Sequence, residues 1–68
     1  MELEYDKEAD TAYIYLKKDI KSGEVKNTIS ISGTINLDFD KNKKLLGIEI
    51  LHASKNISKA DILKNVAT

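Results

Sequence analysis

Residues 35–51, INLDFDKNKKLLGIEIL, decide the fold, because they hold two alternating runs of apolar and polar residues around a lysine-rich turn. Alternation with a period of two is typical of strands that bury one face. The apolar residues of the two runs share one face: Ile35, Leu37 and Phe39 in the first, and Leu46, Ile48 and Ile50 in the second. The stretch therefore predicts an antiparallel hairpin in which Leu37 opposes Ile48 and Phe39 opposes Leu46. Its loop covers residues 41–44, or is a tighter turn on Asn42-Lys43.

Three more runs alternate in the same way, over residues 1–6, 11–16 and 25–31, and extend the prediction to about five strands. A polar connection with a turn at Ser22-Gly23 separates the second run from the third. Sequential strands usually neighbour one another, so we expect a twisted antiparallel β-meander. The pairings that keep apolar residues together are Tyr5 with Ala12, Leu3 with Ile14, and, across an odd loop over 32–34, Ile31 with Ile35.

The period changes near the C-terminal end of the sequence. Ser58 followed by Asp61 resembles a capping box, and Ile57 with Ile62 fits a hydrophobic staple. An apolar stripe follows, which predicts a helix over about 58–67 that is too short to be stable alone. The expected fold is α+β, a single domain over 1–68 with a sheet over about 1–51 and one C-terminal helix packed on one face. Whether the helix covers its own sheet or a partner's stays open.

Composition narrows the function classes. The chain has 68 residues, eleven lysines without arginine against eleven Asp plus Glu, and no cysteine. Disulfides and thiolate metal sites are therefore excluded, and the basic footprint of a nucleic-acid-binding protein is missing. No apolar run approaches the roughly 20 residues of a membrane span, and the acidic, alternating start is unlike a signal peptide. We expect a cytoplasmic protein that binds neither nucleic acid nor membrane.

His52 is the only histidine, and it follows the last expected strand. It could act as a general base beside Ser54. Nucleophilic catalysis also needs a group that orients the base and an oxyanion hole, and the sequence has no glycine-rich elbow. A histidine at a strand end is the better interpretation, so we expect no catalytic residue, no cofactor and no enzyme.

Two groups of acidic residues suggest metal sites. Asp38, Asp40, Asn42 and Glu49 have the spacing of an EF-hand calcium loop. The glycine of that loop is replaced by Lys43, and the flanking segments are strands rather than helices, so we expect no metal there. The second group lies over residues 6–10, where an aspartate that opens a turn caps the local backbone more often than it binds a metal.

The non-core face of the expected sheet is the strongest candidate site. It combines carboxylates with tyrosines and leucines, and cross-strand pairing places Glu4 opposite Tyr13 and Glu2 opposite Tyr15. Tyrosine is enriched at protein interfaces, although an ordinary solvated sheet face would look similar. The candidate partner-binding residues are Glu2, Glu4, Tyr13, Tyr15, Asp38, Glu49 and Leu51.

Two blocks of the sequence resemble a known family. Residues 5–10, YDKEAD, with Ala12-Tyr13-Ile14, form the first block; Ile35, residues 38–40 and 46–51, and Ala53-Ser54 form the second. They resemble the small bacterial and archaeal family catalogued as domain of unknown function 2283. Many relatives have glycine in the last hairpin turn, where this chain has Asn42-Lys43. The resemblance implies a small sheet-rich fold and no established activity, and it suggests an antitoxin or partner-binding role.

These observations favour a non-enzymatic module that binds a protein partner, either another protein or a second copy in a homodimer. An antitoxin that sequesters a small basic toxin is a special case of this hypothesis. The alternative is a weak metal-binding protein that uses Asp38, Asp40 and Glu49.

Overall fold

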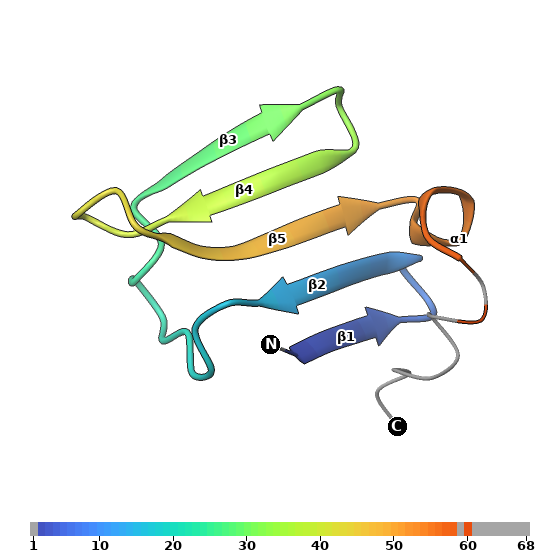
Figure 1. The fold of residues 1–68 in the computed structure, drawn as a ribbon, viewed down its shortest axis with the longest axis horizontal. Helices are drawn as coiled ribbons and strands as arrows, with labels where there is room; N and C mark the ends of the chain where they lie inside the picture. Colours follow the sequence, from blue (N-terminus) through green and yellow to red (C-terminus); the bar gives the residue numbers. More distant parts are fainter. Residues whose placement is uncertain (1, 59, 61–68) are drawn as a thin grey trace.

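The computed structural model describes residues 2–58 and 60 and shows one five-stranded antiparallel sheet with a short helix at one end (Figure 1). The elements in chain order are β1 (Glu2–Asp6), β2 (Thr11–Tyr15), β3 (Asn27–Ile31), β4 (Ile35–Phe39), β5 (Leu45–Leu51) and α1 (Ala53–Asn56). The α+β class and all five predicted strands are confirmed. The helix expected over 58–67 lies outside the described residues, apart from residues 58 and 60.

The predicted meander order is wrong. The strands lie in the order β1-β2-β5-β4-β3, so β2 pairs with β5 instead of with β3 (Figure 1). The reason is the connection over residues 16–26, which is long enough to run past the ends of β5 and β4 and to start β3 at the far edge. This order places β5, the most apolar strand, in the centre of the sheet, where both of its edges are paired.

Most of the predicted pairings are confirmed: Leu3 with Ile14, Tyr5 with Ala12, Ile31 with Ile35, and Leu37 with Ile48. The pairing of Phe39 with Leu46 is wrong, because the register shifts after Asp38 and Phe39 pairs with Leu45. Asp40 and Lys44 close a three-residue loop in which Lys43 has a φ of 65°. This loop sets Phe39 opposite Leu45, whereas Asp38 pairs with Gly47, so Leu46 is the extra residue of a bulge in β5.

The main buried cluster lies where α1 packs on β2 and β5, and Leu46, 3% exposed, is buried separately at the start of β5. Ala12 and Ala53 are 1% and 0% exposed, because their small side chains let the helix approach the sheet closely. The side chains that pack around this pair are Leu3, Tyr5, Ile50 and Ile57. The aliphatic face is much less covered toward β3, where Ile29 is 46% exposed.

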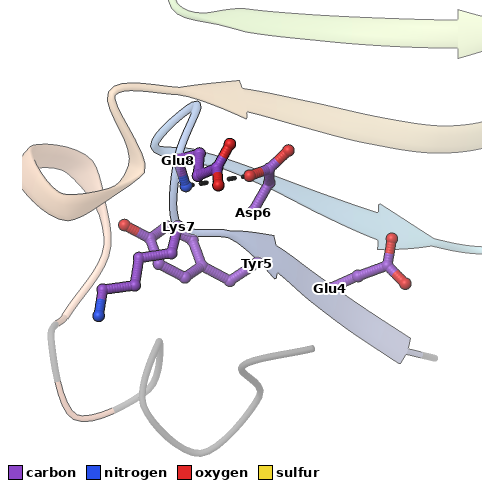
Figure 2. A pocket seen from close by; sticks show the side chains of 5 residues that line it. All are labelled: Glu4, Tyr5, Asp6, Lys7 and Glu8. Carbon is purple, nitrogen blue, oxygen red and sulfur yellow. Dashed lines mark hydrogen bonds between the residues drawn. The ribbon is translucent and has the colours of Figure 1, made fainter. Parts of the chain in front are cut away.

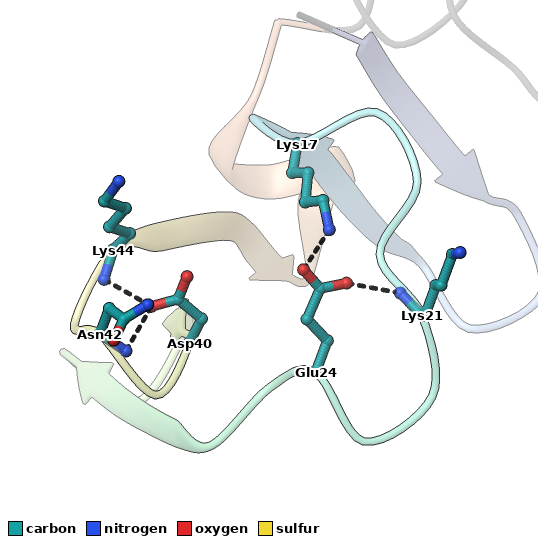
Figure 3. A network of polar contacts seen from close by, with 6 residues as sticks. All are labelled: Lys17, Lys21, Glu24, Asp40, Asn42 and Lys44. Atoms are coloured by element: carbon teal, nitrogen blue, oxygen red, sulfur yellow. Dashed lines mark hydrogen bonds and ion pairs between the residues drawn. The ribbon is translucent and has the colours of Figure 1, made fainter.

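The connection between β2 and β3 is held by its own polar groups (Figure 3). Glu24 accepts a hydrogen bond from the Lys17 ammonium group and one from the Lys21 backbone N–H at 2.9 Å. The Lys17 contact is the main reason why the pKa of Glu24 is lowered. The predicted turn at Ser22-Gly23 is confirmed, since the Glu24 N–H donates to the Lys21 carbonyl at 3.0 Å and Gly23 has a φ of 81°.

Within the described part of the chain, no helix has the length and apolar character needed to cross a membrane.

Candidate functional site

One side of the sheet gathers all seven residues that the sequence singled out as a partner-binding surface. Directly opposed residues of antiparallel strands point to the same side, and the observed registers connect the seven. We call this side the acidic tyrosine face; it bears Glu2, Glu4, Tyr13, Tyr15, Asp38, Glu49 and Leu51. The five strands contain five carboxylates and no lysine, so the charge that the strands contribute to this face is negative.

Tyr13 is the central residue of the face, because its side chain crosses β5 and reaches β4. Its hydroxyl donates a hydrogen bond to Oδ2 of Asp38 at 2.8 Å. The ring lies directly over Gly47, the β5 residue between them, and a Cβ atom at Gly47 would be 2.6 Å from Cζ of Tyr13. Glycine is therefore required at position 47 for this crossing. Thr28 donates to the other oxygen of Asp38 at 2.7 Å, which extends the connection to β3.

Tyr15 lies beside Tyr13 and connects to the other edge of the sheet. The two rings meet edge to face, with centroids 4.7 Å apart. The Tyr15 hydroxyl donates to Oε1 of Glu4 at 3.2 Å. Burial, followed by the nearby Asp38 carboxylate, raises the pKa of Tyr13. Burial, followed by the nearby Glu4 carboxylate, raises the pKa of Tyr15. Both hydroxyls therefore stay protonated and act as donors over the physiological pH range.

A hollow of about 260 Å³ opens on this face, lined by Tyr13, Tyr15, Ile20 and Asp38. Ile20 comes from the connection between β2 and β3, so three separate segments of the chain form the hollow. Two aromatic rings beside a carboxylate are a suitable environment for the cationic end of a lysine or arginine side chain. The carboxylate oxygens of Asp38 can accept further hydrogen bonds, because each has two lone-pair directions.

A second polar cluster, which sequence reasoning missed, is centred on Asp10. Its carboxylate accepts hydrogen bonds from the Tyr5 hydroxyl at 2.7 Å, the Ser54 hydroxyl at 2.7 Å and the Ser54 N–H at 3.0 Å. Its backbone carbonyl accepts from the Ala53 N–H at 2.9 Å. The bonds from Tyr5 and Ser54 lower the pKa of Asp10. Asp10 therefore caps the start of α1 and fixes the helix to the first hairpin.

His52 and Ser54 both make contacts that hold the start of α1. The Ser54 hydroxyl donates to Asp10, and the backbone of His52 has a left-handed φ of 51° at the start of α1. His52 contributes its carbonyl to the Lys55 N–H and the Asn56 side chain. These contacts give His52 and Ser54 structural roles.

The acidic turn after β1 also has a structural role. The Asp6 carboxylate accepts hydrogen bonds from the Glu8 N–H at 3.1 Å and the Ala9 N–H at 3.2 Å, which confirms the predicted capping of the turn. A hollow of about 460 Å³ lies at this place, lined by residues 4–8. Figure 2 shows the side chains of these residues. Among residues 2–58 and 60, its walls come from one strand end and its turn, so no groups from distant segments of this described part converge there.

The carboxylates with calcium-like spacing are separated in the structure. Asp38 binds Tyr13 and Thr28, Glu49 accepts from Asn36 at 2.8 Å, and Asp40 accepts the N–H groups of its own turn. Among residues 2–58 and 60, no group of three or more histidines and carboxylates is placed to hold a metal ion.

Comparisons with known proteins agree with the resemblance seen in the sequence. The family described as "Protein of unknown function (DUF2283)" matches residues 2–54. An uncharacterized protein of Methanocaldococcus jannaschii is 41% identical over 68 residues, which cover 97% of this chain and 54% of that protein. The chain thus spans about half the length of this curated relative. No solved structure matches the chain. The match over most of its length shows that the chain belongs to the DUF2283 family, whose function is unknown.

Proposed function

We propose that the chain is a non-enzymatic protein-binding module that uses its acidic tyrosine face to bind a basic protein surface and that also associates with itself. The observation that carries the first part is the hollow between Tyr13, Tyr15 and Asp38, within a face whose strands contain no lysine. A lysine or arginine of the partner would place its cation against the rings and the carboxylate.

The contacts on the face support a preformed surface. Tyr13, Asp38 and Thr28 are already hydrogen-bonded to one another, and Tyr15 is bonded to Glu4. Side chains that are fixed before binding lose little conformational entropy when a partner arrives. Glu2 and Glu4 are exposed around these contacts and attract a basic partner by long-range electrostatics.

A co-purification experiment tests this proposal. The tagged chain is co-expressed with the products of adjacent genes, because the family resemblance suggests an antitoxin-like role. We expect a complex that weakens with salt and that the Glu2→Lys/Glu4→Lys variant loses. The control variant Glu8→Lys/Asp19→Lys changes two exposed carboxylates in the turns by the same total charge and should keep the complex. Equal binding by the two variants would exclude the acidic tyrosine face as the binding surface.

A further inference from the structure

The two edges of the sheet differ in how they are protected against pairing with another chain. β1 carries Glu2, Glu4 and Asp6, and two copies paired along it would bring carboxylates together. β3, with the sequence NTISI, is exposed at all five residues and has no charge and no proline. It forms the other free edge of the sheet (Figure 1). Only β3 therefore lacks the features that normally prevent edge-to-edge pairing.

The hydrogen-bond pattern shows which backbone groups of β3 are free. The Leu51 N–H donates to the Thr34 carbonyl at 2.7 Å, so the even-numbered residues of β4 direct their backbone groups to β5. The odd-numbered residues of β4 then direct their backbone groups to β3, where they pair with the odd-numbered residues of β3. The N–H and C=O groups of Thr28 and Ser30 consequently point away from the sheet, where a further strand would bind them.

We propose that two copies of the chain pair antiparallel along β3, with Ile29 of each copy at the two-fold axis. In this register Thr28 of each copy opposes Ser30 of the other copy. The free backbone N–H and C=O groups of the two strands can therefore bind each other. It also pairs all five residues of both strands, whereas a shift in either direction leaves residues unpaired. The inference rests on the self-association in the proposed function and places it on the β3 edge, away from the acidic tyrosine face.

The side chains fit the same register. Ile29 and Ile31 are 46% and 44% exposed, and pairing covers both. Ile31 of the second copy would lie opposite Asn27, at the mouth of a hollow of about 230 Å³ whose lining includes Asn27, Ile29 and Phe39. Lys26 would lie opposite Ser32 of the second copy, so the two Lys26 residues are at opposite ends of the pair and do not repel each other.

The contact is small. A stable dimer interface buries about 1,200 Å² or more, and two five-residue strands with four isoleucines bury less than this. We therefore expect a dimer whose population rises with protein concentration.

Disulfide trapping tests the register directly, because the chain has no cysteine of its own. Ile29→Cys places two thiols at a non-hydrogen-bonded pair, where Cβ atoms are about 4.5–5.5 Å apart and a disulfide can form. Ile31→Cys is the matched control, equally exposed on the same strand, but its two copies would be about 13 Å apart along the strands. Under mild oxidation we expect Ile29→Cys to form the covalent dimer at least tenfold faster. Equal rates, or a faster reaction at position 31, would overturn the register.

Sedimentation of the uncross-linked protein tests the pairing itself. The mass of the wild-type chain should rise with concentration, whereas Ile29→Lys, with two ammonium groups at the axis, should remain a monomer. Leu16→Lys changes an equally exposed residue of the same face away from β3 and should sediment like the wild type. A wild-type chain that stays monomeric at millimolar concentration would overturn the pairing along β3. If that monomer still bound a basic partner, the acidic tyrosine face would remain supported as the partner-binding surface. Loss of dimer in Glu2→Lys/Glu4→Lys would instead place the self-association on that face.

Discussion

Replacement of Gly47 by alanine tests the crossing of Tyr13 over β5. The added Cβ would lie 2.6 Å from Cζ of Tyr13, so the ring must move and its hydrogen bond to Asp38 is lost. A hydrogen bond to a carboxylate contributes about 1.5–3 kcal/mol, and this half-buried one belongs at the lower end. Alanine in place of glycine in a strand returns about 0.5–1 kcal/mol. We expect Gly47→Ala to lower the free energy of unfolding by about 0.5–1.5 kcal/mol.

The size of the effect should depend on the Tyr13 side chain. In a Tyr13→Ala background nothing obstructs the new methyl group, so Gly47→Ala should stabilise the fold by about 0.5–1 kcal/mol. In a Tyr13→Phe background the ring must still move, but it has no hydrogen bond to lose, so the cost should be intermediate. The coupling energy between positions 13 and 47 should then be about 1.5–2 kcal/mol, the value of the lost hydrogen bond.

Urea unfolding followed by circular dichroism gives these energies, with the slope m checked for two-state behaviour in every variant. If Gly47→Ala has the same cost in all three backgrounds, the cost does not come from the Tyr13 ring. The Tyr13 ring would then not be the reason for the glycine at position 47.

Three further predictions concern the turns and the response to pH. Lys43 has a left-handed φ of 65°, so Lys43→Gly should stabilise the fold by about 0.5–1 kcal/mol in thermal unfolding, whereas Lys41→Gly in the same turn should destabilise it. The pKa of Asp10 is lowered in the fold, so its contribution is complete above its unfolded pKa of about 3.9 and is lost as the pH falls through the folded value. Urea midpoints should therefore drop below about pH 4, and less steeply in Asp10→Asn. The pKa of Tyr13 is raised by burial and then by Asp38, so its contribution is complete below about pH 10 and is lost as the pH rises through the folded value. In an absorbance titration Tyr13 should ionise last of the tyrosines, and earlier in Asp38→Asn.

The strands and most registers could be predicted, because the side-chain period of a strand is fixed and the apolar residues define one face. Leu3 with Ile14 and Ile31 with Ile35 followed from parity alone. The same parity put the residues of the acidic tyrosine face together. Strand order was beyond this reasoning, since parity says which residues share a face but not which strands are neighbours.

Features that depend on contacts distant in sequence were also missed. The Asp10 cluster joins positions 44 residues apart, and a four-residue helix such as α1 is too short to produce a helical period. The shift at Phe39 accompanies a three-residue turn with a left-handed Lys43, a conformation that a lysine does not indicate. The role of Gly47 was recognisable only after Tyr13 was known to cross it, although an isolated glycine in a strand is a signal of close approach.

An amide-resolved NMR titration shows whether the acidic tyrosine face binds a basic surface. The probe is a lysine-rich helical peptide, added to the labelled chain at low and at physiological salt. We predict that the shifts concentrate at Glu4, Tyr13, Tyr15 and Glu49, decrease with salt, and disappear in Glu2→Lys/Glu4→Lys. Shifts that concentrate instead in the turn around Asp19, or that are equally small along the whole chain, would show that the acidic tyrosine face is not the binding surface.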